Sequence, residues 1–236
     1  MFPVAVLAGG LAKRLQPLTE TVPKALIDID GEPFLAHDLR LLRAHEIEKV
    51  IICVGHLGEM IREKIGGGEE FKLEIQYSFD GPNLLGTAGA IKKALPLLGD
   101  TFFILYGDSY LECDYREVQS VFEASGKPAL MTVYRNDGLW DRSNVEYKDG
   151  AVCVYDKQRQ TSTMRHIDYG LGVFRRSAFE KIPDNQAYDL AAVYQEFLAS
   201  RELAALEVRH RFYEIGSFEG IEEMRRHLRS RSARVR

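Results

Sequence analysis

The sequence predicts an α/β fold in which helices cover both faces of a mixed, mainly parallel sheet. The first observation behind this prediction is a set of short, continuously apolar runs, which are typical of strands buried on both faces. They span residues 4–8, 50–54, 73–79, 101–106 and 129–134. The second observation is helical spacing between the runs, at Leu35, Leu39 and Leu42 and again within 90–98. Strands that alternate with helices predict right-handed crossovers between parallel neighbours.

The rhythm changes after residue 135, where strand candidates follow one another closely. Residues 144–148 and 151–155 are joined by the turn Lys148-Asp149-Gly150, and a further run covers 167–174. We interpret this part as a small antiparallel excursion from the parallel sheet.

Two helices are expected to close the fold, one capped by Asp189 and one over about 217–228. Neither a linker-like stretch nor an internal repeat interrupts the chain, so we expect one domain over residues 1–236. Its expected parts are a first half, 1–135, a closing half, 136–228, and an arginine-rich frayed tail, 229–236.

Composition argues against several classes of function. A formal net charge of −4 does not suit a nucleic-acid binder, which usually carries a strongly basic face. The cysteines, Cys53, Cys113 and Cys153, have no CxxC or Cys/His spacing, so neither a disulfide framework nor a zinc site is indicated. Because no signal-peptide pattern and no membrane-length apolar run is present, we expect a cytoplasmic protein without a membrane or nucleic-acid partner.

A glycine pair follows the first predicted strand. Gly9 and Gly10 stand at the carboxyl end of that strand, where open α/β sheets have their ligand crevice. Glycines that take positive φ can aim successive N–H groups at an anion, and Lys13 and Arg14 follow within four residues. The expected ligand is a polyphosphate, although the spacing matches neither a P-loop nor a dinucleotide fingerprint. By itself, the loop fits a structural turn with solvated basic residues equally well.

Lys24 shifts that balance. Pro17 and Pro23 stiffen the intervening segment, so we expect Lys24 to approach the same cavity from a second direction. Convergence of three cations on one glycine turn is difficult to explain by folding alone.

The stretch LAGGLAKRLQPLTETVPKAL resembles the signature L-A-G-G-x-x-x-R-L-x-P-L-T-x-x-x-P-K of sugar-1-phosphate nucleotidyltransferases. These enzymes join a nucleoside triphosphate to a sugar phosphate and release pyrophosphate. The resemblance continues through LLGTAGAIKKAL (84–95), GDSYL (107–111), VYDKQ (154–158), DYGLGVF (168–174) and YEIGSFEGIEE (213–223). The GTAG form is most similar to mannose- and heptose-1-phosphate guanylyltransferases, with N-acetylmuramic acid-1-phosphate uridylyltransferases close behind.

This resemblance implies a Rossmann-like, GT-A-like fold in which residues 1–135 bind the nucleotide and residues 136–228 bind the sugar. The residues implied to hold the nucleotide at the opening loop are Leu7, Ala8, Gly9 and Gly10, and Lys13 is close enough in sequence to reach the same ligand. Arg14 would grip the triphosphate, and Lys24 would neutralise the phosphates around the reacting phosphorus. Transfer of this kind depends mainly on positioning and electrostatic stabilisation, which makes such cations useful.

Mg²⁺ is the implied cofactor. Asp108 follows the predicted strand 101–106, at the position where the family keeps its main metal carboxylate, and a hard oxygen ligand suits this ion. An ordinary Asx-type turn residue is the alternative explanation of Asp108. The family's second ligand is an aspartate in a D-[VI]-G-T stretch, and Glu214 stands in its place here, one methylene longer.

The resemblance also implies a base-binding stretch at Gly86 and Thr87. Asp80 lies roughly where relatives recognise the base edge. Its carboxylate can accept from two adjacent donors of guanine, whereas uracil offers one, so GTP is favoured. An ordinary turn aspartate before Gly81 explains Asp80 about as well.

On the sugar side, Asp156 and Lys157 replace the family's Glu-Lys pair, with the acid implied to contact sugar hydroxyls and the lysine the phosphate. Asp168 and Gly170 match an Asn-x-Gly that touches the sugar. These departures leave open an unusual acceptor, even a non-sugar phosphate.

The expected activity is transfer from a nucleoside triphosphate, GTP favoured, to a hexose- or heptose-1-phosphate, by a chain that can form a homo-oligomer. One alternative is a uridylyl- or cytidylyltransferase acting on an amino-sugar or non-sugar phosphate. A second is a glycosyltransferase with a DxD motif, for which Glu112-Cys113-Asp114 is a poor substitute. A third is a non-catalytic module that binds a nucleotide sugar.

Overall fold

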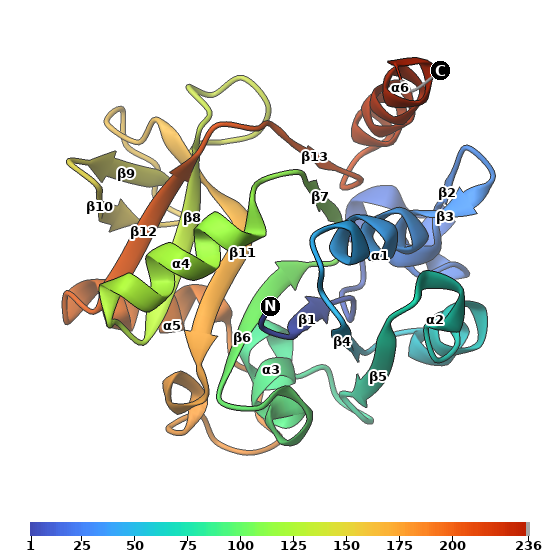
Figure 1. Ribbon diagram of the computed structural model, residues 1–236, viewed down its shortest axis with the longest axis horizontal. Helices are drawn as coiled ribbons and strands as arrows, with labels where there is room; N and C mark the ends of the chain where they lie inside the picture. The colour runs from blue at the N-terminus through green and yellow to red at the C-terminus, as the bar shows by residue number, and fades with distance from the viewer. Residues whose placement is uncertain (235–236) are drawn as a thin grey trace.

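The computed structural model describes residues 1–234, except the side chains of Lys13 and of residues 232–234. In this part of the chain, nine strands form one sheet with the order β10-β9-β11-β6-β1-β4-β5, and β8 and β12 extend it from β11 (Figure 1). Four strands run parallel through β1–β4, β1–β6 and β4–β5 pairs. They are β1 (Val4–Leu7), β4 (Lys49–Val54), β5 (Glu74–Phe79) and β6 (Thr101–Tyr106). Each corresponds to a predicted apolar run.

The antiparallel strands form more of the sheet than the predicted excursion suggests. They surround β11, which pairs antiparallel with β6, β8 and β9 and therefore joins the two halves of the chain. Its pairing with β8 shifts register between Asp168 and Gly172, and β12 runs parallel to β8. The strands here are β8 (Ala129–Arg135), β9 (Val145–Lys148), β10 (Ala151–Tyr155), β11 (His166–Arg175) and β12 (Leu203–Val208).

Helices cover both faces of the sheet, as the continuous apolar strands predict. The alternation along β1 shows the two faces: Val4 and Val6 belong to the core that contains α1, α2 and α4, whereas Ala5 belongs to the core that contains α3 and α5. The helices are α1 (Phe34–Ala44), α2 (Gly58–Ile65), α3 (Gly86–Leu98), α4 (Tyr115–Ser125), α5 (Leu190–Ala199) and α6 (Phe218–Arg234). None of the helices within residues 1–234 combines the length and apolar character that crossing a membrane requires.

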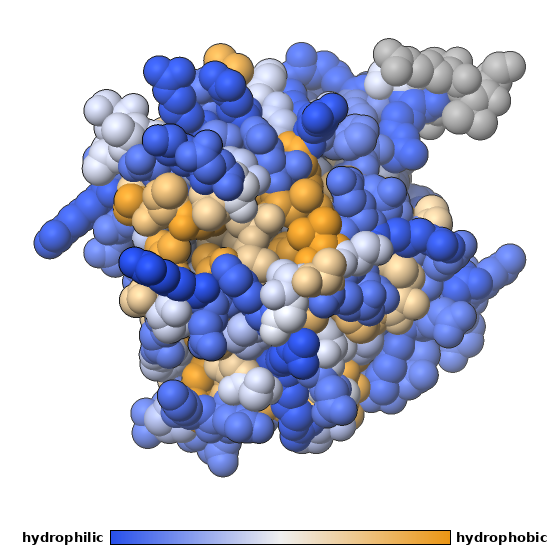
Figure 2. All heavy atoms as spheres, turned by 60° about the vertical axis from the view of Figure 1, so that its left-hand side comes forward, coloured by the Kyte–Doolittle hydropathy of each residue, from blue (hydrophilic) through white to orange (hydrophobic). Residues whose placement is uncertain are grey.

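Short elements complete the chain. A two-residue hairpin, β2 (Asp28–Ile29) with β3 (Glu32–Pro33), precedes α1. The 3₁₀ helices are η1 (Lys13–Leu15), η2 (Leu18–Glu20), η3 (Lys24–Leu26), η4 (Glu69–Phe71) and η5 (Arg176–Phe179). The end of the sheet with β9, β10 and β12 is turned toward the viewer in Figure 2, where apolar residues gather near the middle of a hydrophilic surface.

The last helix is longer than the predicted 217–228 and includes the part of the predicted frayed tail, 229–236, that the structure describes. Helix α6 continues to Arg234 because its arginines find acidic partners. The Arg229 guanidinium binds the Asp30 carboxylate through two nitrogens, and Arg231 lies 2.5 Å from Glu112 and 2.7 Å from the Tyr110 hydroxyl. Residues 235–236 lie outside the described residues.

Candidate active site

Two adjoining cavities lie where the parallel strands end. Because β1, β4, β5 and β6 are parallel, their carboxyl ends meet at one edge of the sheet. The first cavity, of about 310 Å³, is lined by residues at and after these ends, and the second, of about 260 Å³, extends toward β11 and toward β13 (Phe212–Glu214). Tyr106 and Asp108 line both cavities, so the end of β6 forms the boundary between them.

The opening loop borders the first cavity with the predicted residues Leu7, Ala8, Gly9 and Gly10. A Cβ on Gly9 would lie 3.0 Å from the Gly55 nitrogen, so glycine allows this loop to pack against the end of β4. The expectation of positive φ at the glycine pair is wrong, because the chain makes its left-handed turn at Ala12, with φ 45°. The side chain of Lys13 lies outside the described residues.

Arg14 is exposed and lines the second cavity rather than the first. The structure thus separates this guanidinium from the glycine turn that it follows in the sequence. Burial raises the carboxyl pKa of Glu214, and the charge of Arg14 offsets a small part of this rise.

Lys24 returns to the same place from a second direction. Pro23, with φ −64° and ψ 143°, leads into η3, and the Lys24 Nζ lies 2.6 Å from Asp108 Oδ2. Asp108 itself follows β6 directly after Gly107, whose N–H donates to the Leu7 carbonyl. The first cavity therefore has an ammonium and a carboxylate at its boundary with the second.

Glu214 is brought beside Asp108 by a short antiparallel ladder. Strand β7 (Ser109–Leu111) pairs with β13 (Phe212–Glu214) so that Ser109 faces Glu214, and the Ile215 N–H donates to the Asp108 carbonyl at 3.0 Å. Lys24 Nζ and Glu214 Oε1 both lie 3.4 Å from the point where a Gly216 Cβ would stand. The two carboxylates and the ammonium therefore converge, although the acids are more than one hundred residues apart in sequence.

The electrostatics of Glu214 match this crowding. Burial is the main cause that raises its carboxyl pKa, the charges of Asp108 and Asp141 add to it, and Lys24 and Arg14 partly offset it. A group of this kind gains from a bound cation, because the cation offsets repulsion between neighbouring carboxylates.

The carboxylate pair fits Mg²⁺, which proteins usually hold through one or two carboxylates while substrate phosphates and water supply the other oxygens. Asp108 and Glu214 provide two such ligands. Among the residues that the structure describes, no group of three or more histidine, cysteine, aspartate or glutamate side chains is arranged as a complete metal site. The remaining ligands would therefore come from the substrate and solvent.

Asp80 forms part of the wall of the first cavity and is 7% exposed. Its Oδ2 accepts from the Leu85 N–H at 3.0 Å, while Oδ1 accepts no hydrogen bond from the described residues. Burial raises the carboxyl pKa, whereas the Leu85 N–H and the Lys93 charge lower it. One carboxylate oxygen is thus fixed by the loop and the other is available to a ligand.

Gly86 and Thr87 also line the first cavity, and both have structural roles that the sequence does not predict. Gly86 has φ +66°, and a Cβ there would lie 2.8 Å from the Tyr188 carbonyl oxygen. The Thr87 hydroxyl donates to Asp189 at 3.1 Å and accepts from the Leu190 N–H at 2.7 Å. It therefore stabilises the start of α5, where Asp189 is the predicted N-cap.

The structure places some of the predicted sugar-binding residues at the second cavity and one of them outside both cavities. Lys157, Asp168 and Gly170 line the second cavity, whereas Asp156 lines neither cavity. Asp156 instead accepts the N–H groups of Gln158 and Arg159 in its own turn, and these bonds lower its carboxyl pKa. These contacts are those of an Asx-type turn residue.

Three further residues of the second cavity are Tyr106, Asp141 and Asn144. The sequence carries a signal for Tyr106, which directly precedes Gly107-Asp108 at the predicted strand end. The Asn144 Oδ1 accepts the Asp168 N–H at 2.9 Å. Asp141 sits in an irregular loop without any spacing signal.

The DxD-like stretch at 112–114 has structural roles. Asp114 is the N-cap of α4, where it accepts from the N–H groups of Arg116 and Glu117. Glu112 lies 2.7 Å from His227 and also pairs with Arg231, which docks α6 on this part of the chain. Neither carboxylate lines the two cavities, so this stretch gives no support to a glycosyltransferase.

Comparisons with known proteins relate the chain to a family. The profile of the family described as nucleotidyl transferase matches residues 4–138. N-acetylmuramate alpha-1-phosphate uridylyltransferase from Neisseria meningitidis serogroup B is 36% identical over 194 residues, covering 80% of this chain and 81% of that protein. UTP–glucose-1-phosphate uridylyltransferase from Synechocystis sp. is 29% identical over 201 residues. That match covers 78% of this chain, which spans about half, 52%, of that relative's length.

Solved structures share the fold. HddC from Yersinia pseudotuberculosis, complexed with GMP-PN, has a TM-score of 0.80 at 23% identity, with 97% of this chain and 100% of that chain covered. The family profile covers more than half of the 236 residues, and the Neisseria protein matches along most of both chains. This chain therefore belongs to the sugar-1-phosphate nucleotidyltransferases of the nucleotidyl transferase family.

Proposed function

We propose that this chain transfers a nucleotidyl group from a nucleoside triphosphate to a sugar-1-phosphate and releases pyrophosphate. The observation that carries the proposal is the convergence of Lys24, Asp108 and Glu214 at the boundary of two cavities. Each cavity would hold one substrate, and their phosphates would meet at this boundary. Family membership supports the same reaction class.

In the proposed reaction an oxygen of the acceptor phosphate attacks the α-phosphorus in line. The new oxygen–phosphorus bond forms as the bond between the α-phosphorus and its bridging oxygen breaks, and pyrophosphate takes that electron pair. The attacking phosphate is already ionised at neutral pH, so no general base is needed. Lys24 would stabilise the charge that develops on the transferred group.

Asp108 and Glu214 are the residues that would hold Mg²⁺. Bound there, the ion would neutralise phosphate oxygens and help to orient them. Arg14 and Lys157 line the second cavity, so their proposed partner is the acceptor phosphate. The sequence resemblance implies instead that Arg14 binds the triphosphate, so the proposed partner of Arg14 differs from the implied one.

GTP is the proposed nucleotide, and hexose- or heptose-1-phosphates are the proposed acceptors. Asp80 supports the base assignment, because it lines the first cavity and only its Oδ2 accepts a hydrogen bond from the described residues. Guanine would donate its N1–H and 2-amino group to these oxygens. The names of two relatives, both uridylyltransferases, make UTP the nucleotide to compare against.

The test is a grid of GTP, UTP, CTP and ATP against mannose-, heptose-, glucose- and amino-sugar-1-phosphates, with phosphocholine as a non-sugar acceptor. Pyrophosphate release is the readout, with and without Mg²⁺. We expect turnover that requires both substrates and Mg²⁺, with GTP giving the highest kcat/KM.

Asp108→Asn should reduce this turnover about 10²-fold or more, because it removes charge from the metal ligand set. Asp149→Asn, in the exposed β9–β10 turn, is the matched control. Release of a nucleoside diphosphate would instead identify a glycosyltransferase. Tight nucleotide-sugar binding without turnover would identify a non-catalytic module.

A further inference from the structure

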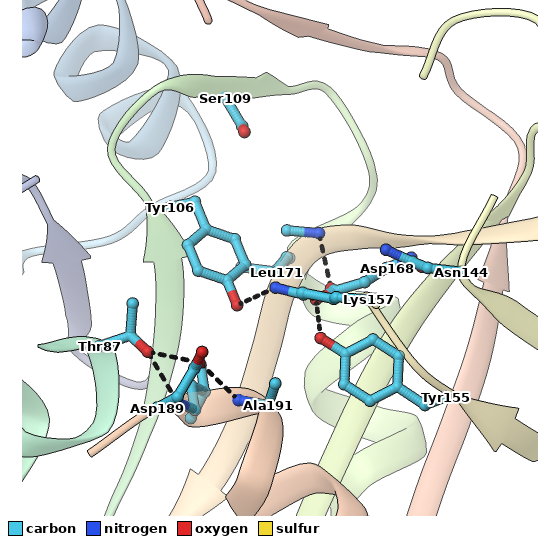
Figure 3. A network of polar contacts seen from close by, with 12 residues as sticks. Thr87, Tyr106, Ser109, Asn144, Tyr155, Lys157, Asp168, Leu171, Asp189 and Ala191 are labelled. Carbon is cyan, nitrogen blue, oxygen red and sulfur yellow. Dashed lines mark hydrogen bonds and ion pairs between the residues drawn. The ribbon is translucent and has the colours of Figure 1, made fainter. Parts of the chain in front are cut away.

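Tyr106 is the last residue of β6, and its side chain lies at the boundary of the two cavities. The Gly170 backbone gives it room: a Cβ there would stand 3.4 Å from Tyr106 Cδ2, and Gly170 adopts φ +99°. The ring is therefore packed against β11, and its hydroxyl points toward Lys157, as Figure 3 shows.

The Tyr106 hydroxyl receives a hydrogen bond and retains its own proton. Lys157 Nζ donates to it at 3.2 Å and lies 4.9 Å from the centre of the ring. A phenol has one O–H donor besides its acceptor capacity, and no acceptor for this proton occurs among the described residues. A phenol hydroxyl is protonated at neutral pH, so this one can donate to a ligand.

Lys157 is held from its other side by Asp168. The two charged groups lie 3.5 Å apart, and the Asp168 side chain is only 3% exposed. Asp168 also accepts from the Tyr155 hydroxyl at 3.0 Å and from the Gly170 N–H at 3.2 Å. The Asp168 carboxylate is thus held in place by two hydrogen bonds, and its ion pair holds the Lys157 ammonium beside Tyr106 (Figure 3).

We infer that Tyr106 binds substrate directly, by donating its O–H to an oxygen of the acceptor phosphate beside Lys157. The location carries this inference: a free donor and a fixed ammonium share one corner of the second cavity, next to Asp108. The identity of that phosphate rests on the proposed function. The α-phosphate of the nucleotide is the competing partner, since Tyr106 also borders the first cavity.

The test compares Tyr106→Phe with Tyr77→Phe. Tyr77 lies on β5 outside both cavities, and its hydroxyl donates one hydrogen bond to the Gly66 carbonyl. The Tyr77→Phe substitution removes that bond and therefore controls for the loss of a tyrosine hydroxyl. We expect Tyr106→Phe to raise the KM for the acceptor about 10-fold, the usual cost of a lost charge-assisted bond. The KM for the nucleotide should change less than about 2-fold.

A double variant, Tyr106→Phe with Lys157→Met, adds a second readout. Because Tyr106 also orients Lys157, the two changes should be less than multiplicative in the acceptor KM. Unchanged kcat and acceptor KM in Tyr106→Phe would overturn the inference while the proposed function stands. An increase confined to the nucleotide KM would also overturn it, in favour of the α-phosphate.

Inorganic phosphate separates failure of this inference from failure of the proposed function. Its binding to the wild type and to Tyr106→Phe can be measured by calorimetry without any turnover. If no substrate pair reacts, a roughly 10-fold weaker affinity in the variant still supports the inference. Equal affinity in both proteins, or no binding to either, would overturn it.

Discussion

The Lys24 ammonium lies 2.6 Å from Asp108 Oδ2, although 84 residues separate them in the sequence. This ion pair connects the segment behind Pro23 to the end of β6, and both side chains remain partly accessible. An accessible pair can exchange partners when a phosphate and a cation arrive. The pair thus keeps both charges in place before substrate binds.

Replacement of Lys24 tests this pair most directly. Lys24→Ala should lower kcat about 10²–10³-fold, because it removes a cation aimed at the developing charge. The Tm should change little, since Lys24 lies in the short 3₁₀ helix η3 and its ion pair with Asp108 is partly accessible to solvent. Lys64→Ala, on the exposed side of α2, is the control. Activity within a few-fold of the wild type would contradict the role assigned to Lys24.

Glu214 predicts a pH-dependent effect on stability. Its carboxyl pKa is raised above 4.5 in the folded protein, mainly by burial and next by Asp108. The native state therefore binds the Glu214 proton more tightly than the unfolded state does. As pH rises from the unfolded pKa through the raised native pKa, Glu214 ionises and the free energy of unfolding falls. Without divalent ions, Glu214→Gln should raise the Tm at pH 8 by no more than about 4 °C and leave it unchanged near pH 4.

Thermal denaturation across this pH range measures the effect of the Glu214 substitution, with Glu63→Gln on exposed α2 as control. Addition of Mg²⁺ should stabilise the wild type more than Glu214→Gln, since the amide is the weaker ligand. A variant less stable than the wild type at pH 8 without Mg²⁺ would show that the carboxylate makes favourable native contacts instead.

Asp80 predicts a change in base preference. Asp80→Asn retains an oxygen for the Leu85 N–H but places an amino group where guanine would also donate. The ratio of kcat/KM for GTP to that for UTP should fall about 10-fold or more. Steady-state kinetics with both nucleotides checks this, and Asp149→Asn serves as control. An unchanged ratio would assign Asp80 to the loop alone.

Substitution of Thr87 should reduce the stability of the protein rather than its recognition of the base. Thr87→Val removes the donor to Asp189 and the acceptor of the Leu190 N–H at the start of α5. The expected cost is about 1–3 kcal/mol in unfolding free energy, because polar groups lose their partners. Urea denaturation measures it, and Thr161→Val in an exposed turn is the control. A stable variant with impaired GTP binding would reverse this assignment.

Much of the fold could be predicted because short apolar runs in the sequence indicate most of its strands. The apolar runs of β6 and β10 agree with the structure residue for residue, and Asp189 caps α5 as predicted. Helices α2 and α4 were not predicted. For α4 a signal was present, since Asp114 precedes a stripe that contains Val118 and Phe122. For α2 the apolar stripe is short and follows Leu57 in a left-handed conformation.

The sequence by itself determined the family, the parallel strands and the candidate charges Lys24 and Asp108, because these depend on short motifs and local periodicity. Only the tertiary structure decided which charges meet. It places Glu214 beside Asp108 through the β7–β13 register, assigns Asp156 to its own turn, and fixes Lys157 between Tyr106 and Asp168. The physical reason is that side-chain direction and strand register depend on packing between distant segments, which residue spacing does not encode.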